Sequence, residues 1–248
     1  PTSIGEADTY LFSADYPGFY YLEMEALMGQ ECIPIFLNGA EGNQTIGNPE
    51  KKSGWERTES VGRLIARRAH EIAQNISYTD TTLKLIHKMA GLPRTLGETL
   101  MPNEVMLQSL EINDLLISFF PGEPCVELGL TLRNLALARG YGAHFSVGLS
   151  NDYLMYFVPR HLYGDLTYES VMTFFGPGIE DWFYEQFQDM MQLPAAASEQ
   201  TAEKPDPAIT ETEIEGGRLV TVRGTSFQTG RLRGERFAAD MVALYRER

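Results

Sequence analysis

The chain has 248 residues, 43% of them hydrophobic, so it can bury one substantial core with room for a tail or part of a second domain. Its 34 acidic residues outnumber its 20 basic ones, and the formal charge of −14 argues against binding to nucleic acid or anionic lipid headgroups. No stretch approaches the roughly 18 apolar residues that a transmembrane segment needs. We therefore expect a soluble globular chain that binds no nucleic acid, and its compartment stays open, secreted and periplasmic locations included.

The first third of the chain predicts a strand, a loop and a long helix. Residues 32–37 form a short apolar run that ends at Asn38 and Gly39, which is typical of a buried strand entering a turn. A loop follows, to about residue 53. Ser53 and Glu56 have the spacing of a capping box, and apolar residues then recur at helical intervals. The pattern predicts a helix over 54–76.

The rest of the chain alternates between strand and helix patterns. Residues 81–89 place apolar side chains on one face and lysines on the other, as in a half-buried strand. The later segments show either β-rich composition or helical periodicity. In chain order they predict strands at 105–110 and 115–120, a helix at 126–139 that ends at Gly140, strands at 144–149 and 153–158, and a helix at 179–191.

The periodic pattern ends near Leu193, where we place a domain boundary. Residues 194–210 hold three consecutive alanines and three prolines without periodicity, which indicates a linker. The sequence thus predicts a domain over 1–193, a linker over 194–210, and a segment over 211–248. This last segment begins a second domain or forms a C-terminal strand–helix extension.

Two loops offer candidate catalytic groups. The segment Asn38 to Thr45 follows the predicted strand, so that its backbone amides and the Thr45 hydroxyl could converge on a ligand, with Thr45 as nucleophile. From spacing alone a local hydrogen bond of Thr45 to the backbone is the favoured alternative. Glu123 lies in a turn between Pro121 and Pro124, and a rigid turn suits a metal-binding carboxylate. The alternative is an acid that favours the N-terminus of the next helix.

Tyrosines and histidines complete the candidates. Tyr153 and Tyr156 are three residues apart, so a strand would send them to opposite faces and only one would point into a given site. Tyr168 follows twelve residues after Tyr156. Tyrosines in strands usually serve packing, which is the alternative for all three. The four histidines are scattered without a metal-binding partner at short spacing, and we expect them to be structural.

Four segments occur in an order that resembles the neutral/alkaline non-lysosomal ceramidase family. They are residues 13–18, 36–42, 121–123 and 148–156, and the resemblance extends over about residues 1–193. It implies an α/β fold of mixed β-sheets sandwiched between helices (αββα-like), present here as a partial ceramidase-type catalytic domain. Enzymes of this family use zinc to hydrolyse the amide of ceramide.

The resemblance assigns roles to four residues. Glu123 falls on the family's glutamate zinc ligand, Tyr156 rather than Tyr153 on its tyrosine ligand, and Tyr168 on a tyrosine that stabilises the oxyanion. Thr45 stands where characterised ceramidases have a nucleophilic serine, and it keeps a hydroxyl. The two zinc histidines would lie upstream of Pro1, so the Zn²⁺ site needs ligands that this chain does not supply.

The expected function is a zinc-dependent amidohydrolase that cleaves ceramide-like N-acyl lipids or related amides. This fragment alone is expected to be inactive, and further domains of the same polypeptide are expected upstream and downstream. Two alternatives stay open: a catalytically inactive ceramidase-like binding module, and a hydrolase of other amides or esters. The segment 223–235 also resembles the opening of linear-amide acyltransferases of the N-terminal-nucleophile class, with a strand, turn and helix of no special meaning as the alternative.

Overall fold

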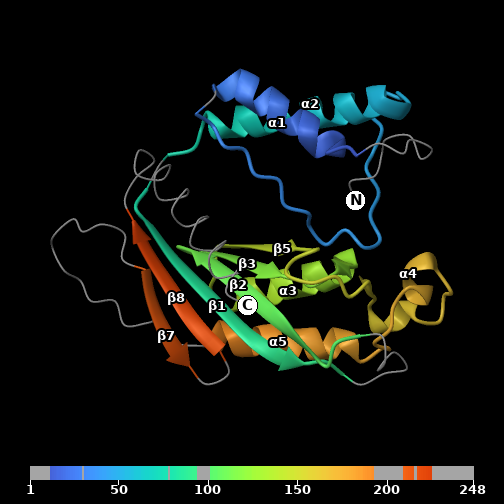
Figure 1. Cartoon of the computed structure of the whole chain (residues 1–248), viewed down its shortest axis with the longest axis vertical. Coiled ribbons are helices and arrows are strands. Elements are labelled where there is room, and N and C mark those ends of the chain that lie inside the picture. Colours follow the sequence, from blue (N-terminus) through green and yellow to red (C-terminus); the bar gives the residue numbers. More distant parts are fainter. Residues whose placement is uncertain are drawn as a thin grey trace.

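A computed structural model describes residues 12–29, 31–77, 79–93, 101–192, 209–214 and 217–224. The fold is of the mixed α/β class, as the sequence predicts, with one six-stranded sheet and helices on both of its sides (Figure 1). The helices α1 and α2 lie on one side of the sheet, and α3 and α5 lie on the other. None of the helices in these ranges is long and apolar enough to cross a membrane.

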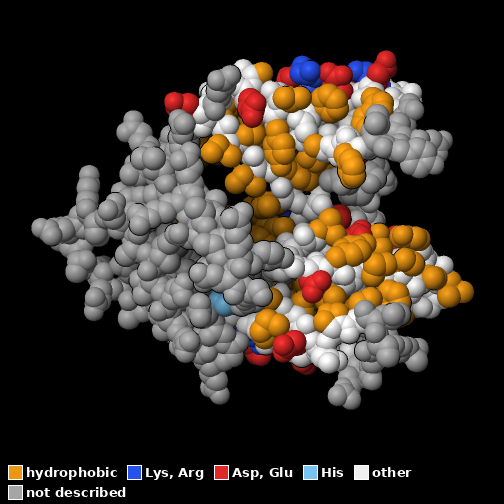
Figure 2. Space-filling view, in the orientation of Figure 1, with side chains coloured by type: hydrophobic (Ala, Val, Ile, Leu, Met, Phe, Trp, Pro, Cys, Tyr) orange, Lys and Arg blue, Asp and Glu red, His pale blue; other side chains and the backbone are white. Residues whose placement is uncertain are grey.

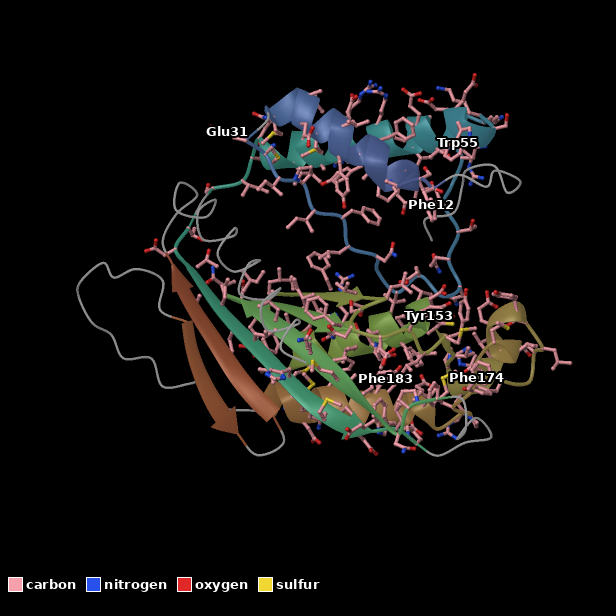
Figure 3. All side chains as sticks on the ribbon, viewed as in Figure 1. Phe12, Glu31, Trp55, Tyr153, Phe174 and Phe183 are labelled. Atoms are coloured by element: carbon pink, nitrogen blue, oxygen red, sulfur yellow. The ribbon has the colours of Figure 1, made fainter. Side chains whose placement is uncertain are left out.

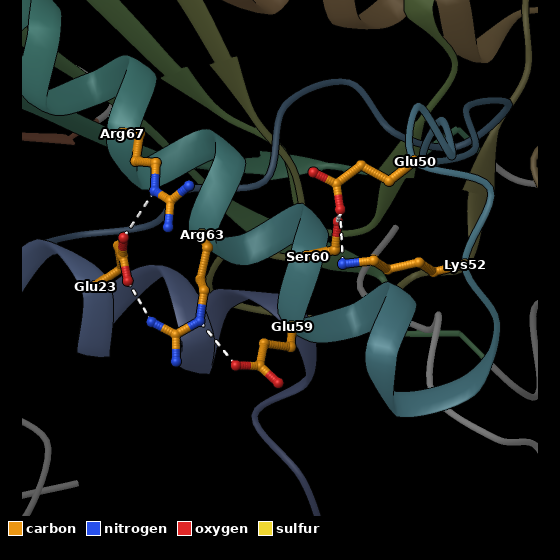
Figure 4. Close-up of polar contacts among 7 residues, drawn as sticks. All are labelled: Glu23, Glu50, Lys52, Glu59, Ser60, Arg63 and Arg67. Atoms are coloured by element: carbon orange, nitrogen blue, oxygen red, sulfur yellow. Dashed lines mark hydrogen bonds and ion pairs between the residues drawn. The ribbon is translucent and has the colours of Figure 1, made fainter.

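The helices α1 (Asp15–Met28) and α2 (Gly54–Ala73) pack closely against each other. Gly62 permits this approach, because a Cβ atom at this position would lie 2.4 Å from the carbonyl oxygen of Tyr16. Two arginines of α2 then bind the carboxylate of Glu23 in α1 (Figure 4). One is Arg63, and the other is Arg67, whose Nε lies 2.9 Å from the Glu23 carboxylate. Ion pairs and close backbone packing thus join α1 and α2 into one layer.

The sequence analysis did not predict α1. Its segment carries Pro17 and Gly18, which disfavour a helix interior, and its apolar residues do not follow a single stripe. In the structure Pro17 lies in the first turn, where no intrahelical N–H bond is needed, so the proline is compatible with the helix.

The strand predicted over 32–37 is wrong. Residues 31–40 form an extended segment without strand pairing, which runs between the α1–α2 layer and the sheet (Figure 1). Ile33 and Ile35 are both 70% exposed, and Leu37 is 51% exposed. An apolar run alone does not make a strand, because a strand needs a neighbour that accepts its backbone hydrogen bonds.

The sheet has the strand order β5-β3-β2-β1-β8-β7. Only β3 and β5 pair in parallel, and α3 connects them as a crossover; all the other neighbours are antiparallel. The strands are β1 (Thr81–Gly91), β2 (Glu104–Ile112), β3 (Leu115–Phe119), β5 (Ala143–Val147), β7 (Ile209–Ile214) and β8 (Gly217–Gly224).

The main core lies between this sheet and the helices α3 (Val126–Ala138) and α5 (Ile179–Gln192). The rings of Phe183 and Phe187 both lie 5.0 Å from the ring of Phe120, and Phe183 lies 4.6 Å from Phe157. Phe120 and Phe157 flank the segments that carry the candidate site, so this aromatic cluster gives the site a rigid base. Short elements complete the fold: β4 (Glu123–Pro124), β6 (Tyr156–Phe157), α4 (Tyr168–Val171) and a 3₁₀ turn at Arg160–Leu162.

The predicted helices over 54–76, 126–139 and 179–191 and the strands over 81–89, 105–110, 115–120 and 144–149 are confirmed within a few residues. The strand predicted over 153–158 shrinks to β6, because Met155 has a positive φ of 66° that interrupts extended backbone. In the tail, β8 pairs with β1 and thereby extends the sheet. The division into domains stays a prediction, and residues 193–208 and 225–248 lie outside the described part of the chain.

Candidate active site

Three segments that are far apart in the sequence meet beyond the end of β3. Leu149 N–H donates to Gly122 O at 2.8 Å, Leu154 N–H to Pro121 O at 2.8 Å, and Glu123 N–H to Met155 O at 2.9 Å. The loop 38–45 joins them, because Gly42 N–H donates to Pro124 O at 2.9 Å. Backbone hydrogen bonds thus fix the relative positions of loop 38–45, turn 121–125 and segment 148–157.

Glycines allow these segments to approach so closely. A Cβ atom at Gly42 would lie 2.6 Å from the Glu123 carbonyl oxygen, and one at Gly122 would lie 2.5 Å from the Met155 carbonyl oxygen. Both neighbours are backbone atoms, so they cannot move aside as the end of a flexible side chain can.

Asn43 ties the loop to α3. Its Oδ1 accepts a hydrogen bond of 2.8 Å from the N–H of Val126, and its Nδ2 donates one of 2.9 Å to the carboxylate of Glu127. The first of these satisfies an N–H at the start of α3 that has no partner within the helix. Asn43 therefore acts as a helix cap supplied by a distant loop, and it fixes loop 38–45 beside the turn that carries Glu123.

Glu123 and two tyrosines form the centre of the arrangement. The Tyr153 hydroxyl donates to the Glu123 carboxylate at 2.7 Å, and Glu123 also contributes to the raised pKa of Tyr156. β4 and β6 pair in parallel with Glu123 directly opposite Tyr156. Tyr168, at the start of α4, lies edge-on to the Tyr156 ring, with 5.5 Å between the ring centroids. We call this group, Glu123 with Tyr153, Tyr156 and Tyr168, the Glu123 site.

The premise that sends Tyr153 and Tyr156 to opposite faces, a continuous strand, does not hold. Tyr153 precedes β6, and Met155 lies in the left-handed region with φ 66°. In this arrangement the Tyr153 hydroxyl reaches the Glu123 carboxylate, while Tyr156 lies opposite Glu123 on the paired strand. Figure 3 shows Tyr153 on the side of the sheet layer that faces α1 and α2, with Phe183 deeper in the core below it.

The two tyrosines are neutral phenols at neutral pH. The hydrogen bond to Glu123, followed by burial, raises the pKa of Tyr153 to about 12. Burial, and then the hydrogen bond to Glu123, raise the pKa of Tyr156 well above its usual range. Both hydroxyls keep their protons because the carboxylate beside them disfavours a second negative charge.

Backbone strain accumulates in the segment that carries the tyrosines. Leu149, Asn151 and Met155 have φ values of 54°, 69° and 66°, in a region that residues other than glycine rarely adopt. Each such residue costs about 1 kcal/mol or more, and such residues concentrate at functional sites. The strain marks segment 148–157 as part of a site independently of its side chains.

Thr45 lies in loop 38–45 and is exposed. No contact among those of the described residues links its hydroxyl to Glu123 or to the tyrosines. The structure therefore brings Glu123, Tyr156 and Tyr168 together and leaves Thr45 at the margin. Its role as nucleophile stays a prediction.

Sequence reasoning missed Glu41. Its side chain is only 6% exposed, and neither carboxylate oxygen has a hydrogen-bond partner. Burial raises the pKa of Glu41 to about 7; the backbone N–H of Glu41 itself and the charge of the N-terminus oppose this shift, and Glu123 adds a smaller increase. The only signal in the sequence is an acidic residue inside a glycine-rich loop, and such residues are usually solvated.

Two of the histidines have contacts outside the Glu123 site. His144 is buried in β5, with its Nε2 3.2 Å from the Ser118 hydroxyl, and burial lowers its pKa to about 4. His70 contacts Met28 in the helix layer. In the part of the chain that the structure describes, no three His, Cys, Asp or Glu side chains could hold a metal ion together.

The donors of the Glu123 site fit part of a zinc site. Catalytic zinc ions usually have three protein ligands, of which a carboxylate is often one. Glu123 and Tyr156 fit as two oxygen donors on adjacent strands. The remaining donors would come from outside the residues described.

Together these features define a mixed α/β domain with a cluster of one carboxylate and several tyrosines at the end of its sheet. A scan against models of protein families finds no match, and no curated protein matches the sequence. Solved structures do match. The neutral ceramidase from Pseudomonas aeruginosa aligns with a TM-score of 0.64 and 17% identity, over 82% of this chain and 45% of its own. A second structure, described as a ceramidase complexed with C2, aligns with a TM-score of 0.60 and 16% identity, over 79% of this chain and 45% of its own.

The fold of this chain is therefore ceramidase-like. At these identities the likeness establishes the fold and leaves the activity to be tested. The chain spans less than half the length of both ceramidases.

Proposed function

We propose that this chain is part of the catalytic domain of a zinc-dependent amidohydrolase that cleaves ceramide-like N-acyl lipids or related amides. The observation that carries the proposal is the Glu123 site in a ceramidase-like fold: one carboxylate that accepts a hydrogen bond from Tyr153 and lies opposite Tyr156 on the paired strand. Structural packing alone does not require this grouping, or the positive φ values of the segment that carries the tyrosines.

In this proposal Glu123 and Tyr156 hold the zinc ion, together with histidines that this chain does not supply. Zinc, when bound, is a Lewis acid that polarises the amide carbonyl. Tyr156 would have to give up its proton to serve as a ligand, because a metal competes with that proton. Tyr153 stays hydrogen-bonded to Glu123 and orients its carboxylate.

The other residues act on the amide itself. A water molecule or the Thr45 hydroxyl attacks the carbonyl carbon, the C–N bond breaks, and the proton lost by the attacking oxygen passes to the leaving nitrogen. If Thr45 attacks, a water molecule then hydrolyses the acyl ester on Thr45, which releases the fatty acid and restores the hydroxyl. Tyr168 donates a hydrogen bond to the oxygen on which negative charge develops. Its ring is edge-on to Tyr156 and 64% exposed, so its hydroxyl is accessible to a substrate.

An apolar surface beside the site supports a lipid substrate. Figure 2 shows the molecule hollowed between the α1–α2 layer and the sheet, with hydrophobic side chains on both sides of the hollow. The segment 31–40 crosses this space and leaves Ile33, Ile35 and Leu37 largely exposed. An acyl chain could bury such surface, which would favour binding by about 25 cal/mol per Å² of apolar area.

The test is zinc content and amide hydrolysis in the full-length polypeptide. We expect close to one zinc ion per chain and release of fatty acid from an N-acylsphingosine. Glu123→Gln should lower both, whereas the exposed Glu50→Gln should change neither. A protein with no bound zinc and no hydrolysis would refute the proposal.

Two further comparisons refine it. Thr45→Ala should abolish hydrolysis if the threonine hydroxyl attacks the carbonyl, and should leave hydrolysis within a few-fold if water does. N-acylsphingosine, short acyl amides and acyl esters, assayed side by side, distinguish a ceramide-like substrate from other amides or esters.

A catalytically inactive binding module is the second candidate. It is favoured by the exposed Thr45, whose hydroxyl contacts no base among the described residues, and by the contacts of His70 and His144, which lie outside the Glu123 site. It predicts binding of N-acyl lipids without zinc and without turnover.

A further inference from the structure

Among the residues that the structure describes, Glu41 is the one carboxylate near the Glu123 site whose oxygens are both buried and unpartnered. Its side chain is more than nine-tenths buried, and each of its oxygens lacks a hydrogen-bond partner. A buried carboxylate of this kind costs several kcal/mol unless something donates to it. No other residue among those described donates to these oxygens, so a ligand is the natural donor.

The fold builds a specific place for this side chain. A Cβ atom at Gly148 would lie 2.4 and 2.5 Å from the two oxygens of Glu41, so the carboxylate occupies the space that a side chain at 148 would fill. Gly148 N–H in turn donates to Asn38 O at 3.2 Å, which fixes loop 38–45 against segment 148–157. The carboxylate is therefore positioned between two of the three segments that make the Glu123 site.

The charges around Glu41 determine what it can bind. Glu123 lies close enough to raise its pKa, and the charge of Glu41 in turn contributes to the raised pKa values of Tyr153 and Tyr16, which are neutral phenols. No basic side chain forms an ion pair with Glu41 or Glu123 in the residues that the structure describes. Such a surrounding repels anions and attracts a positively charged group with N–H donors.

We propose that the Glu41 carboxylate binds the nitrogen side of the ligand, as the N–H of a secondary amide and then as the primary ammonium group that its cleavage releases. This inference rests on the proposed amide hydrolysis, and it names the substrate class: amides of primary amines. Tertiary amides and esters have no N–H group that could donate a hydrogen bond to Glu41.

The binding test uses three amphiphiles of equal chain length below their micellar concentrations. Octylamine carries a protonated ammonium at pH 8, octyltrimethylammonium carries the charge without N–H donors, and octan-1-ol carries neither. Calorimetric titration of the chain should show octylamine binding at least about tenfold more tightly than either of the others, as expected for hydrogen bonds to a charged group.

Two variants locate the effect. Glu41→Gln should lower the affinity for octylamine to that for octan-1-ol. Its affinity for octan-1-ol should equal that of the wild type, and this unchanged binding also shows that the variant is folded. Gly148→Ala keeps the charge of Glu41 but places a methyl group in the space that its carboxylate occupies. This variant should also bind octylamine more weakly. Glu50→Gln is the matched control and should bind like the wild type.

Equal binding of octylamine and octan-1-ol by the wild type overturns the inference, and so does octylamine binding that Glu41→Gln leaves intact. Binding of octyltrimethylammonium as tight as that of octylamine overturns the N–H recognition. If octylamine binds as expected but the full-length polypeptide hydrolyses no amide, the proposed function fails while the amine site stands.

Discussion

Replacing Glu41 by glutamine should change how the stability of this protein depends on pH. Burial raises the pKa of Glu41 from 4.5 to about 7 in the folded chain. Between these two values the folded chain holds a proton that the unfolded chain has released. The free energy of unfolding therefore falls as the pH rises through this window, by about 3 kcal/mol in total.

His144 acts in the opposite direction. Burial lowers its pKa from 6.5 to about 4, so between these values the unfolded chain binds a proton that the folded chain does not. The free energy of unfolding rises with pH through this window, by a similar amount of about 3 kcal/mol. In the wild type the two groups nearly cancel between pH 4.5 and 6.5. Glu41→Gln removes the contribution of Glu41, so the free energy of unfolding should then rise with pH in this window because of His144.

Urea unfolding at pH 5 and at pH 8, in the presence of a metal chelator, measures the effect. At pH 5 Glu41 is largely protonated, so a neutral glutamine should change little. At pH 8 it is ionised and buried, so glutamine should stabilise the chain. The stabilisation at pH 8 should exceed that at pH 5 by about 3 kcal/mol, while Glu50→Gln shows no such difference. A difference below about 0.5 kcal/mol would refute the burial of a titrating carboxylate at this position.

Three further predictions concern the helix layer, the loop and the metal. Gly62→Ala should lower the free energy of unfolding by about 1–3 kcal/mol, because the added methyl group would meet the backbone of α1. Gly164→Ala adds a methyl group in open space and should be nearly neutral. Urea unfolding of the two variants measures the difference. Asn43→Ala removes the cap of α3 and should cost about 1–2 kcal/mol in the same assay. The zinc affinity of the full-length polypeptide should increase with pH, because the ligating phenol has a raised pKa and the metal must displace its proton. Tyr156→Phe should abolish that part of the pH dependence, and zinc titrations at several pH values measure it.

Local patterns in the sequence were sufficient for most of the regular elements. The apolar stripe of α2 and the alternation of β1 each repeat over several turns or pairs, so these elements were predicted within a few residues. Glu123 could be singled out because two prolines fix its turn. Its role as a ligand came from the resemblance to ceramidases, and stays a prediction.

Where local patterns were short, tertiary contacts decided the outcome. The apolar run at 32–37 found no strand to pair with and remained an extended segment. Tyr153 and Tyr156 were expected on opposite faces of one strand, but a left-handed residue between them interrupts that strand, and Tyr153 donates to Glu123. Near the C-terminus, β8 pairs with β1, although more than a hundred residues of sequence separate the two strands.

The sequence by itself determined which faces of the long strands and helices are apolar. Apolar residues recur every two residues along a strand and every three to four residues along a helix, so the pattern is repeated many times. Only the tertiary structure decided that Glu41 is buried, since its burial depends on a glycine more than a hundred positions away that leaves room for the carboxylate. A loop carboxylate carries no periodic signal, and its protonation is set by the neighbours that folding places around it.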